Sequence, residues 1–433
     1  MATNLVENGS LADRVSKLSE AKRRLLESRI SGAPSGPARR MRIERRSSSS
    51  APLSFGQMRL WFLHQISPEM TAYNIHRALR VSGPLNVAGL TQSLAEMVRR
   101  HHSFRTSFRI LENEPAQIVA SHWTLSVPIV DLTSLGSDEK QHKVSELAAA
   151  ENARSFDLEA GPLFRTFVGK LAGNDHFLLY TLHHIISDAR SSEILIEEMV
   201  QLYQAYSAGE RSSLGEPELQ YTDFASWQRD NLKGEVLDSQ LRYWKDRLSG
   251  RTLAPTLPLD HPRPSIKSFR GKYYSITLPD ELCRALKSCA RTERTTLFVA
   301  LLAGFCILLR RYSGAEDLSV GTVVSNRGFP EIERVIGFFV NTLVIRTDLS
   351  GEIAVSTAIS RVHQVATEAF SNAELPFERL IHELRLERDL SRTPLFQTAF
   401  SFQDSGRTAD SNVGELIVAP LSSEAGSAKY DLT

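Results

Sequence analysis

The sequence is poor in cysteine and has no excess of charge of either sign. Its three cysteines, Cys283, Cys289 and Cys306, show neither CxxC spacing nor a neighbouring histidine cluster. This argues against a metal site and against a disulfide framework, and a reducing, cytoplasmic setting is the simplest expectation. The 51 basic and 50 acidic side chains nearly cancel. The chain as a whole therefore offers no field that would hold nucleic acid or an anionic membrane.

Long apolar runs and targeting signals are also missing. The longest apolar run, from Leu297 to Leu309, is shorter than the roughly 20 residues of a membrane span, and we interpret it as a buried helix. The first residues lack the basic-then-apolar order of a signal peptide. A hydrophobic fraction of 42% and a charged fraction of 23% are typical of a soluble globular protein. The length of 433 residues predicts more than one compact unit.

Basic residues are concentrated near the start of the chain. Residues 1–50 hold eleven Lys and Arg against five Asp and Glu. The leucine spacing in residues 18–30 predicts one short helix, which the glycines and prolines of "SGAPSGP" would end. The remainder, as far as "RRSSSS", is typical of a linker. Residues 1–50 are therefore either a helix that docks a partner protein or a solvated leader, and the composition favours neither.

From Ala51 onward helical and strand patterns alternate. Leu90, Leu94 and Met97 recur at helical spacing, whereas two apolar runs of strand character flank Gly173. The helices expected are 85–104, 192–206 and 295–312, and the strands expected are the hairpin 163–184 and the segments 272–279, 318–324 and 341–349.

A cluster of prolines divides this pattern into two halves. Four prolines between positions 255 and 264 stand close together and forbid regular helix. The order of elements is similar on both sides, without a clear internal repeat in the sequence. We therefore predict an α/β fold of two lobes, with the N-terminal lobe at 51–230 and the C-terminal lobe at 231–433.

The stretch "TLHHIISDARS", residues 181–191, places polar groups at the end of an apolar strand. If residues 177–184 form that strand, His183 and His184 point to opposite faces, so both cannot line the same cavity. Asp188 precedes a helical pattern and could cap the helix. An isolated pair of histidines is most often structural. Two histidines, a carboxylate and a change from strand to helix so close together favour a functional site.

"HHIISDA" resembles the HHxxxDG signature of the condensation domains of nonribosomal peptide synthetases. Six further segments resemble the remaining motifs of that family, in the same order, over residues 54–397. They are "SFGQMRLWFLHQ" (54–65), "RRHHSFRTSF" (99–108), "YTDFASWQ" (221–228), "IGFFVNTLVIR" (336–346), "AELPFE" (373–378) and "RDLSRTPLFQ" (388–397). Chance does not plausibly produce such a series.

The resemblance implies a fold like that of chloramphenicol acetyltransferase, with two α/β lobes in a V and an active-site tunnel between them. A donor and an acceptor carrier protein would each send a phosphopantetheine arm into the tunnel from opposite ends. The amine of the acceptor's aminoacyl group would attack the donor's acyl or peptidyl thioester and form an amide. The domain itself would bind no cofactor and no metal, because both substrates arrive on the arms.

By the same resemblance His184 takes the catalytic position, either as a general base or as a hydrogen-bond partner that positions the attacking amine. His183 is assigned to structural support. Asp188 would order the loop through a salt bridge with an arginine of the other lobe, for which Arg327 is the candidate. Ala189 replaces the signature glycine, whose backbone N–H would face the developing oxyanion. Its methyl group is expected to exclude strained backbone angles and to narrow the tunnel.

Two further residues are expected to support the site. Arg105 is interpreted as a member of a structural ion pair. Asn341 would either shape the loop that bridges the lobes or hydrogen-bond at a strand edge. Gly56 and His102 stand where the family usually has alanine and glutamate, and both changes are expected to be tolerated.

Other reactions on the same fold are weighed against amide formation. Epimerisation domains differ in the later motifs, heterocyclisation domains replace the histidines by DxxxxD, and acyl transfer from a free acyl-CoA does not fit the motif series. An ester formed with a hydroxyl acceptor remains an alternative, because the same base would serve it. A catalytically silent module that recruits another enzyme is a further alternative, although such modules typically lose the second histidine, which this chain keeps as His184.

The resemblance also implies a place in an assembly line for natural product biosynthesis. The closing "AKYDLT" resembles the stretch in which such domains run into the next module, so this chain is expected to belong to a larger synthetase. Since Met1 opens the chain, the donor is expected from a separate upstream synthase, which makes either peptides or polyketides. If residues 1–50 form the docking helix, they would be the surface that binds this synthase.

Overall fold

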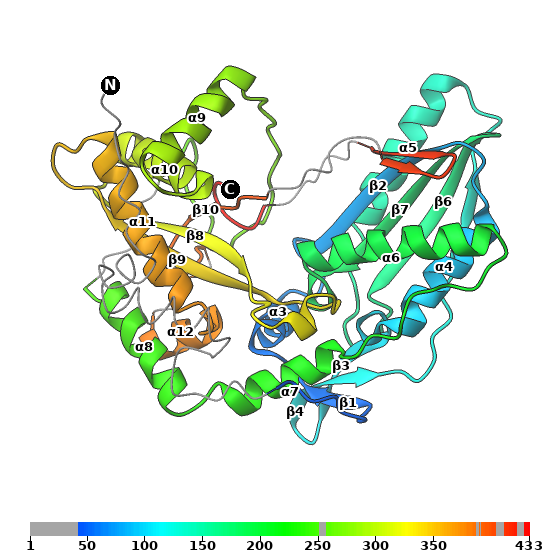
Figure 1. Cartoon of the computed structure of the whole chain (residues 1–433), viewed down its shortest axis with the longest axis horizontal. Helices are drawn as coiled ribbons and strands as arrows, with labels where there is room; N and C mark the ends of the chain where they lie inside the picture. The colour runs from blue at the N-terminus through cyan, green and yellow to red at the C-terminus, as the bar shows by residue number, and fades with distance from the viewer. Residues whose placement is uncertain (1–41, 251–256, 387–388, 390, 404–410, 422–427) are drawn as a thin grey trace, which may run out of the picture. The chain divides into compact units, whose positions relative to one another are not determined.

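The computed structural model describes residues 42–250, 257–386, 389, 391–403, 411–421 and 428–433. The helix expected at 18–30 lies outside the described residues, as does most of the docking segment 1–50. The chain divides into two compact units, Met1–Glu44 and Arg45–Thr433. The elements described below belong to the second unit, and their fold is mixed α/β, as the sequence predicts (Figure 1).

A six-stranded sheet forms the centre of the N-terminal lobe. Its order is β11-β12-β2-β7-β6-β5, with every pair antiparallel except β5 and β6. β6 and β7 form the hairpin expected at 163–184. The strand bounds are β2 Asn74–Ser82, β5 Ile129–Asp131, β6 Phe164–Ala172, β7 Asp175–His183, β11 Ser411–Val413 and β12 Leu416–Pro420.

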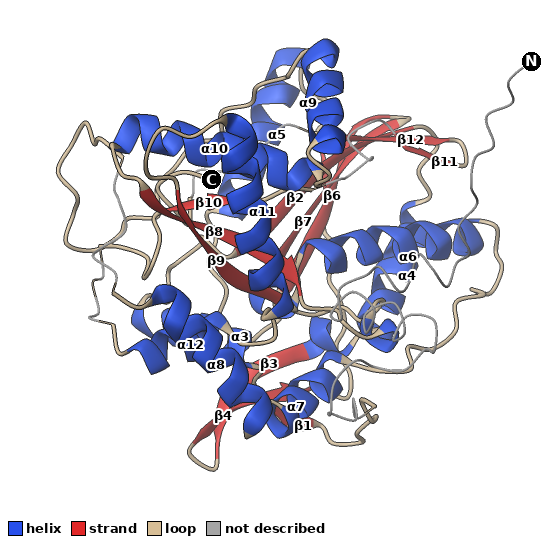
Figure 2. Cartoon of the chain, turned by 60° about the vertical axis from the view of Figure 1, so that its left-hand side comes forward, coloured by secondary structure: helices blue, strands red, loops and turns tan. Residues whose placement is uncertain are grey.

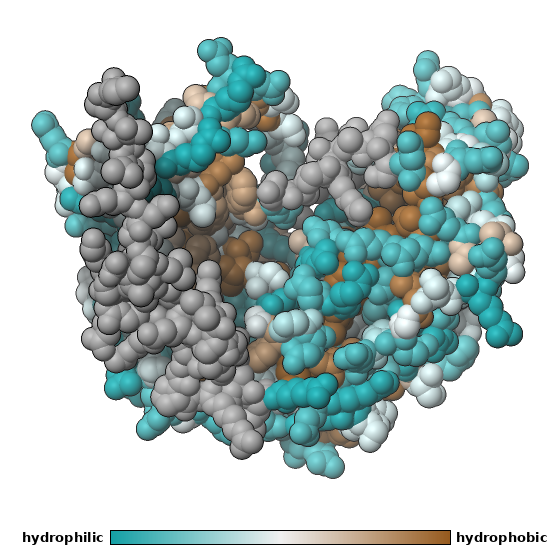
Figure 3. Space-filling model, in the orientation of Figure 1, coloured by the Kyte–Doolittle hydropathy of each residue, from teal (hydrophilic) through white to brown (hydrophobic). Residues whose placement is uncertain are grey.

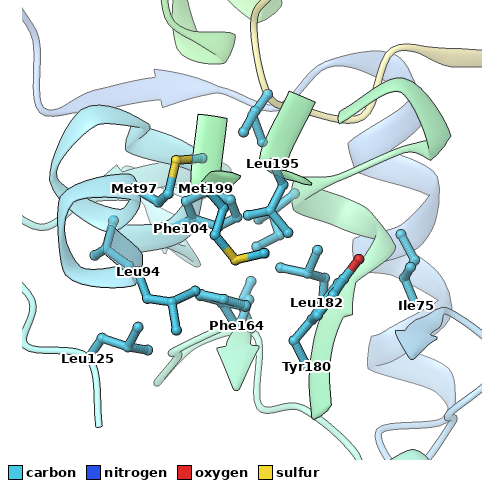
Figure 4. Packing of buried hydrophobic residues seen from close by; sticks show 14 of the residues in the cluster. Ile75, Leu94, Met97, Phe104, Leu125, Phe164, Tyr180, Leu182, Leu195 and Met199 are labelled. Atoms are coloured by element: carbon cyan, nitrogen blue, oxygen red, sulfur yellow. The ribbon is translucent and has the colours of Figure 1, made fainter. Parts of the chain in front are cut away.

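Helices cover both faces of this sheet, and every residue of β7 after Asp175 is buried. Leu178, Tyr180 and Leu182 alternate along one face and pack in the main core with α4 and α6 (Figure 4). Phe177 and Leu179 point to the other face and pack with α5. The strand therefore reads as a continuous apolar run in the sequence, as strands buried on both faces do. The helix bounds are α4 Val87–Arg100, α5 Ser137–Asn152 and α6 Ala189–Ser207.

A smaller antiparallel sheet, of order β1-β4-β3, lies against helix α7. Helix α3 begins next to β1 with a capping box: the side chain of Ser54 accepts from the Gln57 N–H, and the side chain of Gln57 accepts from the Ser54 N–H. The bounds are β1 Ser50–Pro52, α3 Phe55–Ile66, η1 His102–Arg105, β3 Thr106–Leu111, β4 Glu114–Val119 and α7 Tyr221–Asn231.

The C-terminal lobe is built on a sheet of order β10-β8-β9, in which β10 is parallel to β8. Helices α10 and α11 lie against this sheet (Figure 2) and form a second core with Trp244 of α8. The longest apolar run is thus a core helix, as expected, with Leu302 and Cys306 buried. The bounds are α8 Glu235–Leu248, α9 Asp280–Thr292, α10 Leu297–Ser313, β8 Asp317–Ser325, η3 Pro330–Ile332, β9 Val340–Asp348, α11 Val355–Ser371, α12 Phe377–Leu384 and β10 Thr398–Phe400.

Two expectations from the sequence are wrong. Residues 231–433 do not all belong to the C-terminal lobe, because β12 pairs with β2 and brings β11 into the sheet of the N-terminal lobe. The strand expected at 272–279 is not formed, and Tyr273, Tyr274 and Ile276 are largely exposed there. An alternating pattern becomes a strand only where a neighbouring backbone supplies the ladder of hydrogen bonds, and the described residues supply none to this segment.

No single helix among the described residues combines the length and the apolarity of a membrane span. Helices α9 and α10 meet that test only together, with a bend of 104° between them. The face of the molecule seen in Figure 3 is mostly polar, with apolar patches near the centre of the view.

Candidate active site

The stretch "HHIISDA" turns from strand to helix over a few residues. β7 ends at His183, the 3-10 helix η2 spans His184–Ile186, and α6 begins at Ala189. Asp188 is the N-cap of α6, because its Oδ1 accepts a hydrogen bond of 2.7 Å from the Ser191 N–H. The polar residues stand at the end of an apolar strand because this turn needs their side chains as hydrogen-bond partners.

His184 is half-buried, and one of its ring nitrogens remains available. Its Nδ1 lies 3.2 Å from the carbonyl oxygen of Ser187. Only an N–H can bond a carbonyl, so Nδ1 carries the proton and Nε2 carries a lone pair. Among the described residues, no group forms a hydrogen bond with Nε2. Burial lowers the pKa of His184 well below its ordinary value, and the ammonium of Lys429 lowers it further. The ring is therefore a neutral base at pH 7.

His183 is buried, and its Nδ1 already has a hydrogen-bond partner. Its ring meets those of Tyr73 and Phe156 at centroid distances of 6.5 and 6.0 Å. Its Nδ1 accepts a hydrogen bond of 3.1 Å from the Ile185 N–H, which fixes the start of η2. Burial lowers the pKa of His183 to about 3. These contacts give the first histidine a structural role and leave the second to face the site.

Asp188 and Arg327 form the ion pair that the sequence predicts. Arg327 Nη2 donates to Asp188 Oδ1 over 3.1 Å, and both side chains are almost completely buried. The Phe339 N–H donates to Asp188 Oδ2 over 3.1 Å. Arg327 Nη1 donates to the carbonyl oxygens of Ile332 and Val335 over 2.8 and 2.7 Å. The pair is thus surrounded by the additional hydrogen bonds that a buried ion pair needs.

Ser191 completes this connection between the lobes, and the sequence does not single it out. Its hydroxyl donates to the Gly337 carbonyl over 2.8 Å and accepts from the Gly337 N–H and from Arg327 Nη2 over 3.0 and 2.9 Å. One donor and two lone pairs are all that a serine has. A Cβ at position 337 would lie 1.9 Å from the Tyr221 ring, so glycine is required there. Serine near a helix start is too common to reveal such a role.

The expectation that the methyl group of Ala189 excludes strained backbone angles does not apply. Ala189 is the first residue of α6, has ordinary right-handed backbone angles and an exposed side chain. Alanine is favoured in a helix relative to glycine. The departure from the signature glycine therefore leaves the turn intact.

Arg105 does not take the role expected of it. No carboxylate of the described residues lies within ion-pair distance of its guanidinium, and its Nη1 donates instead to the carbonyl of Ala120, in the same lobe. Burial lowers the pKa of Arg105. The residue braces the end of η1 against the segment that follows β4, and it makes no polar contact with the histidines.

Asn341, at the start of β9, fixes the loop that leads into α12. Its Nδ2 donates to the carbonyls of Ala373 and Leu375 over 2.8 and 2.7 Å, and its Oδ1 accepts from the Phe377 N–H over 3.0 Å. Asn341 is buried. Asn341 thus shapes a loop, but this loop joins α11 to α12 within the C-terminal lobe and is not the loop expected to bridge the lobes.

A cluster of charged and aromatic side chains that the sequence reasoning missed adjoins His184. The Tyr73 ring meets His184 edge-on at 6.4 Å, and Lys429 Nζ lies 4.9 Å from the centre of the Tyr73 ring. Burial and the charge of Arg59 lower the pKa of Lys429 to about 8. Arg59 itself pairs with Glu378 over 3.3 Å. Their positions in the sequence are so far apart that only the fold brings them together.

The fold and the site together define a two-lobed α/β domain with a neutral histidine at the end of a central strand. The family model described as "Condensation domain" matches residues 47–433. The chain belongs to the condensation domain family, and its resemblance to the condensation domains of nonribosomal peptide synthetases is confirmed.

Two curated relatives place this family membership in context. The chain is 44% identical over 386 residues to a linear gramicidin synthase of Brevibacillus parabrevis, covering 88% of this chain and 5% of that protein. It is 37% identical over 427 residues to phosphinothricin tripeptide synthetase PhsC of Streptomyces viridochromogenes, covering 98% of this chain and 39% of that protein. The chain thus spans less than half of the length of these relatives.

Solved structures show the same fold at lower identity. The X-domain from teicoplanin biosynthesis superposes with a TM-score of 0.81 at 24% identity, over 90% of this chain and 86% of that one. The first condensation domain of the CDA synthetase superposes with a TM-score of 0.71 at 18% identity, over 89% of each chain. The two-lobed fold that the sequence implies is therefore correct.

Proposed function

We propose that this domain joins a donor acyl or peptidyl thioester to the amine of an acceptor aminoacyl thioester, both carried on phosphopantetheine arms of carrier proteins. The proposal rests mainly on the protonation and the hydrogen bonding of the His184 ring. Its Nδ1–H is tied to the Ser187 carbonyl, its Nε2 has a lone pair, and its pKa is lowered by burial. A neutral ring in a fixed orientation can accept a hydrogen bond from the attacking amine and position it, whereas the lowered pKa makes the ring a weak base for complete proton removal.

The reaction then proceeds by addition and elimination. The acceptor amine attacks the donor carbonyl carbon, and a new C–N bond forms while His184 Nε2 holds or accepts the amine proton. The C–S bond of the donor breaks, and the proton passes to the departing thiolate. The amide remains on the acceptor arm, and the donor carrier leaves with a free thiol.

The start of α6 supports the negative charge that develops on the carbonyl oxygen. Ala189 contributes a backbone N–H in the first turn of a helix of 19 residues, where the helix dipole favours an anion. The carboxylate of Asp188 is already paired with Arg327 and with two backbone N–H groups. Its negative charge is therefore largely neutralised and repels the developing oxyanion only weakly. Ala189 thus serves through its backbone, for which alanine and glycine are equivalent.

The test is an intact-mass assay with an acyl-loaded donor carrier and an aminoacyl-loaded acceptor carrier. The wild type is expected to transfer the acyl mass to the acceptor, and His184→Ala is expected to be slower by about 10²–10⁴-fold. His382→Ala, whose side chain is 78% exposed on α12, is the matched control and should keep the wild-type rate. Equal rates for His184→Ala and the wild type would refute the proposal.

A catalytically silent recruiting module is the second candidate. The observation that favours it is the close superposition with the teicoplanin X-domain, which has been solved in complex with OxyB. The same assay separates the two, since a silent module transfers no acyl group to any acceptor. A hydroxyacyl-loaded acceptor, added as a further arm, distinguishes ester formation from amide formation.

A further inference from the structure

Gly56 and Phe338 fit closely against each other beside His184. Gly56 is in the first turn of α3, and Phe338 lies in the segment that leads into β9. A Cβ placed on Gly56 would lie 3.0 and 3.2 Å from two carbons of the Phe338 ring. Contacts this short force the ring to shift by a few tenths of an ångström. The missing side chain at position 56 therefore leaves the space that the ring occupies.

The backbone around Phe338 cannot move to relieve such a contact. Gly337 is held at both its N–H and its carbonyl by the Ser191 hydroxyl. The Phe338 carbonyl accepts from the Tyr221 hydroxyl over 2.5 Å, and the Phe339 N–H is held by Asp188. Any adjustment is thus confined to the side chain of Phe338.

The Phe338 ring contacts the His184 ring and also lines a small cavity of about 10 Å³, which is room for about one water. On one side it meets the His184 ring in a T-shaped contact, with 6.0 Å between centroids. On the other it lines a cavity whose wall His184 does not reach. The other residues of that wall include Ser54, Gly56, Tyr221, Asn341, Pro376 and Glu378. The ring is only partly buried, so it presents a face to whatever enters.

We propose that Phe338, given room by Gly56, sets the size of the apolar side chain on the carrier-bound acyl group that can reach His184. This inference rests on the proposed function and adds a determinant of substrate size to it. We therefore expect the wild type to prefer acyl groups with small side chains, such as alanyl, over aromatic ones. An added methyl at position 56 displaces the ring, and removal of the ring frees the volume that it occupies beside His184.

The proposal is tested by competition between alanyl and phenylalanyl groups in one reaction. In one arm the two groups compete on donor carriers against a glycyl acceptor, and in the other they compete on acceptor carriers against a glycyl donor. The arm in which the Phe338 substitution changes the product ratio shows whether Phe338 limits the size of the donor side chain or of the acceptor side chain. The product ratio does not depend on how much of a variant is folded, because both substrates meet the same molecules.

Phe338→Ala is expected to lower the preference for alanyl by about tenfold or more in one arm, since even one methylene more or less in an apolar pocket changes discrimination by about 10–200-fold. Gly56→Ala alone is expected to change the ratio of alanyl to phenylalanyl product. In the double variant with Phe338→Ala, the Gly56→Ala substitution should have no further effect on this ratio. Gly304→Ala is the control, because a Cβ there meets nothing within 4 Å. An unchanged ratio in both arms for Phe338→Ala would overturn the inference, as would an effect of Gly56→Ala that persists without the ring.

A binding measurement separates this inference from the proposed function. Alanyl- and phenylalanyl-pantetheine amides, in which nitrogen replaces the thioester sulfur, need no turnover, and their affinities are measured by calorimetry. If no pair is condensed but Phe338→Ala raises the relative affinity for the phenylalanyl amide, the proposed function fails and the size determinant stands. If the amides bind wild type and Phe338→Ala with the same relative affinity, the size determinant fails.

Discussion

Arg327 Nη2 lies 3.1 Å from Asp188 Oδ1, although the two residues are 139 positions apart in the chain and belong to different lobes. Asp188 caps the helix that follows the histidines, and Arg327 precedes the segment that carries Phe338. One buried carboxylate therefore holds the turn of His184 and the facing segment of the other lobe at the same time. The position of the His184 turn relative to the Phe338 segment therefore depends on this pair.

Asp188→Asn is expected to lower the free energy of unfolding by about 3–5 kcal/mol, because it leaves the buried guanidinium of Arg327 without a counter-charge. Urea denaturation followed by circular dichroism measures the loss. Asp230→Asn is the control, since Asp230 pairs with Arg46 on the surface with side-chain exposures of 57% and 51%. Such an exposed pair contributes at most about 1 kcal/mol. Equal losses for the two variants would contradict a structural role for the buried pair.

Stability is expected to fall as the solution is acidified, in part through His183. Its pKa is about 3 in the folded chain, because burial disfavours the charged ring, against about 6.5 in an unfolded chain. The unfolded chain thus binds the proton first, so the stabilisation by neutral His183 is complete above about pH 6.5 and is lost toward pH 3. Its contribution to the slope is up to about 1.4 kcal/mol per pH unit.

His183→Asn is expected to flatten this dependence, because asparagine can accept the Ile185 hydrogen bond but does not titrate. Urea midpoints at a series of pH values between about 6.5 and about 4 provide the measurement. His261→Asn is the control, since His261 is exposed. A slope for His183→Asn as steep as that of the wild type would show that His183 titrates normally in the folded state.

Sequence reasoning worked where a local pattern determines the structure. Periodicity located the β6–β7 hairpin and α10. The alternation argument for His183 and His184 does not apply, because β7 ends at His183 and His184 already belongs to the 3-10 helix η2. The partner of Asp188 came from the family resemblance, because nothing in local sequence links it to Arg327. The role of Ser191 could not be predicted from the sequence, because its three hydrogen bonds are made with Gly337 and Arg327 of the other lobe.

The errors have a common physical origin in long-range pairing. The strand expected at 272–279 has the right side-chain pattern, but no described backbone pairs with it. Strands β11 and β12 cross to the other lobe because β2 offers a free edge there, and no local signal records that edge. Hydrogen bonds between distant strands decide both cases, and a single sequence does not display them.

Lys429→Met is expected to raise the pKa of His184. Lys429, His183 and Arg77 are the charged or titratable groups that lower this pKa in addition to burial, and Lys429 is the strongest of the three. NMR titration of the histidine ring carbons from about pH 4 to about pH 8 measures the shift. Lys245→Met removes a lysine that pairs with Glu383 on the surface and should leave the titration unchanged. A pKa of His184 that is unchanged in Lys429→Met would remove Lys429 from the electrostatics of the site.

Asn341→Asp tests whether the loop before α12 depends on a donor at this position. The substitution places a carboxylate oxygen against the carbonyls of Ala373 and Leu375, which now receive hydrogen bonds of 2.8 and 2.7 Å. Three buried oxygen acceptors would then face one another without a donor. This arrangement is expected to lower the free energy of unfolding by about 2–4 kcal/mol, because of the unsatisfied groups and the buried charge.

Thermal unfolding measures this loss of stability, and faster proteolytic cleavage near residues 373–377 would locate it in the loop. Asn412→Asp, at an exposed strand position, carries the same change of charge and should behave as the wild type. Because Pro376 and Glu378 line the cavity next to Phe338, a loosened loop is also expected to weaken the preference for small acyl groups.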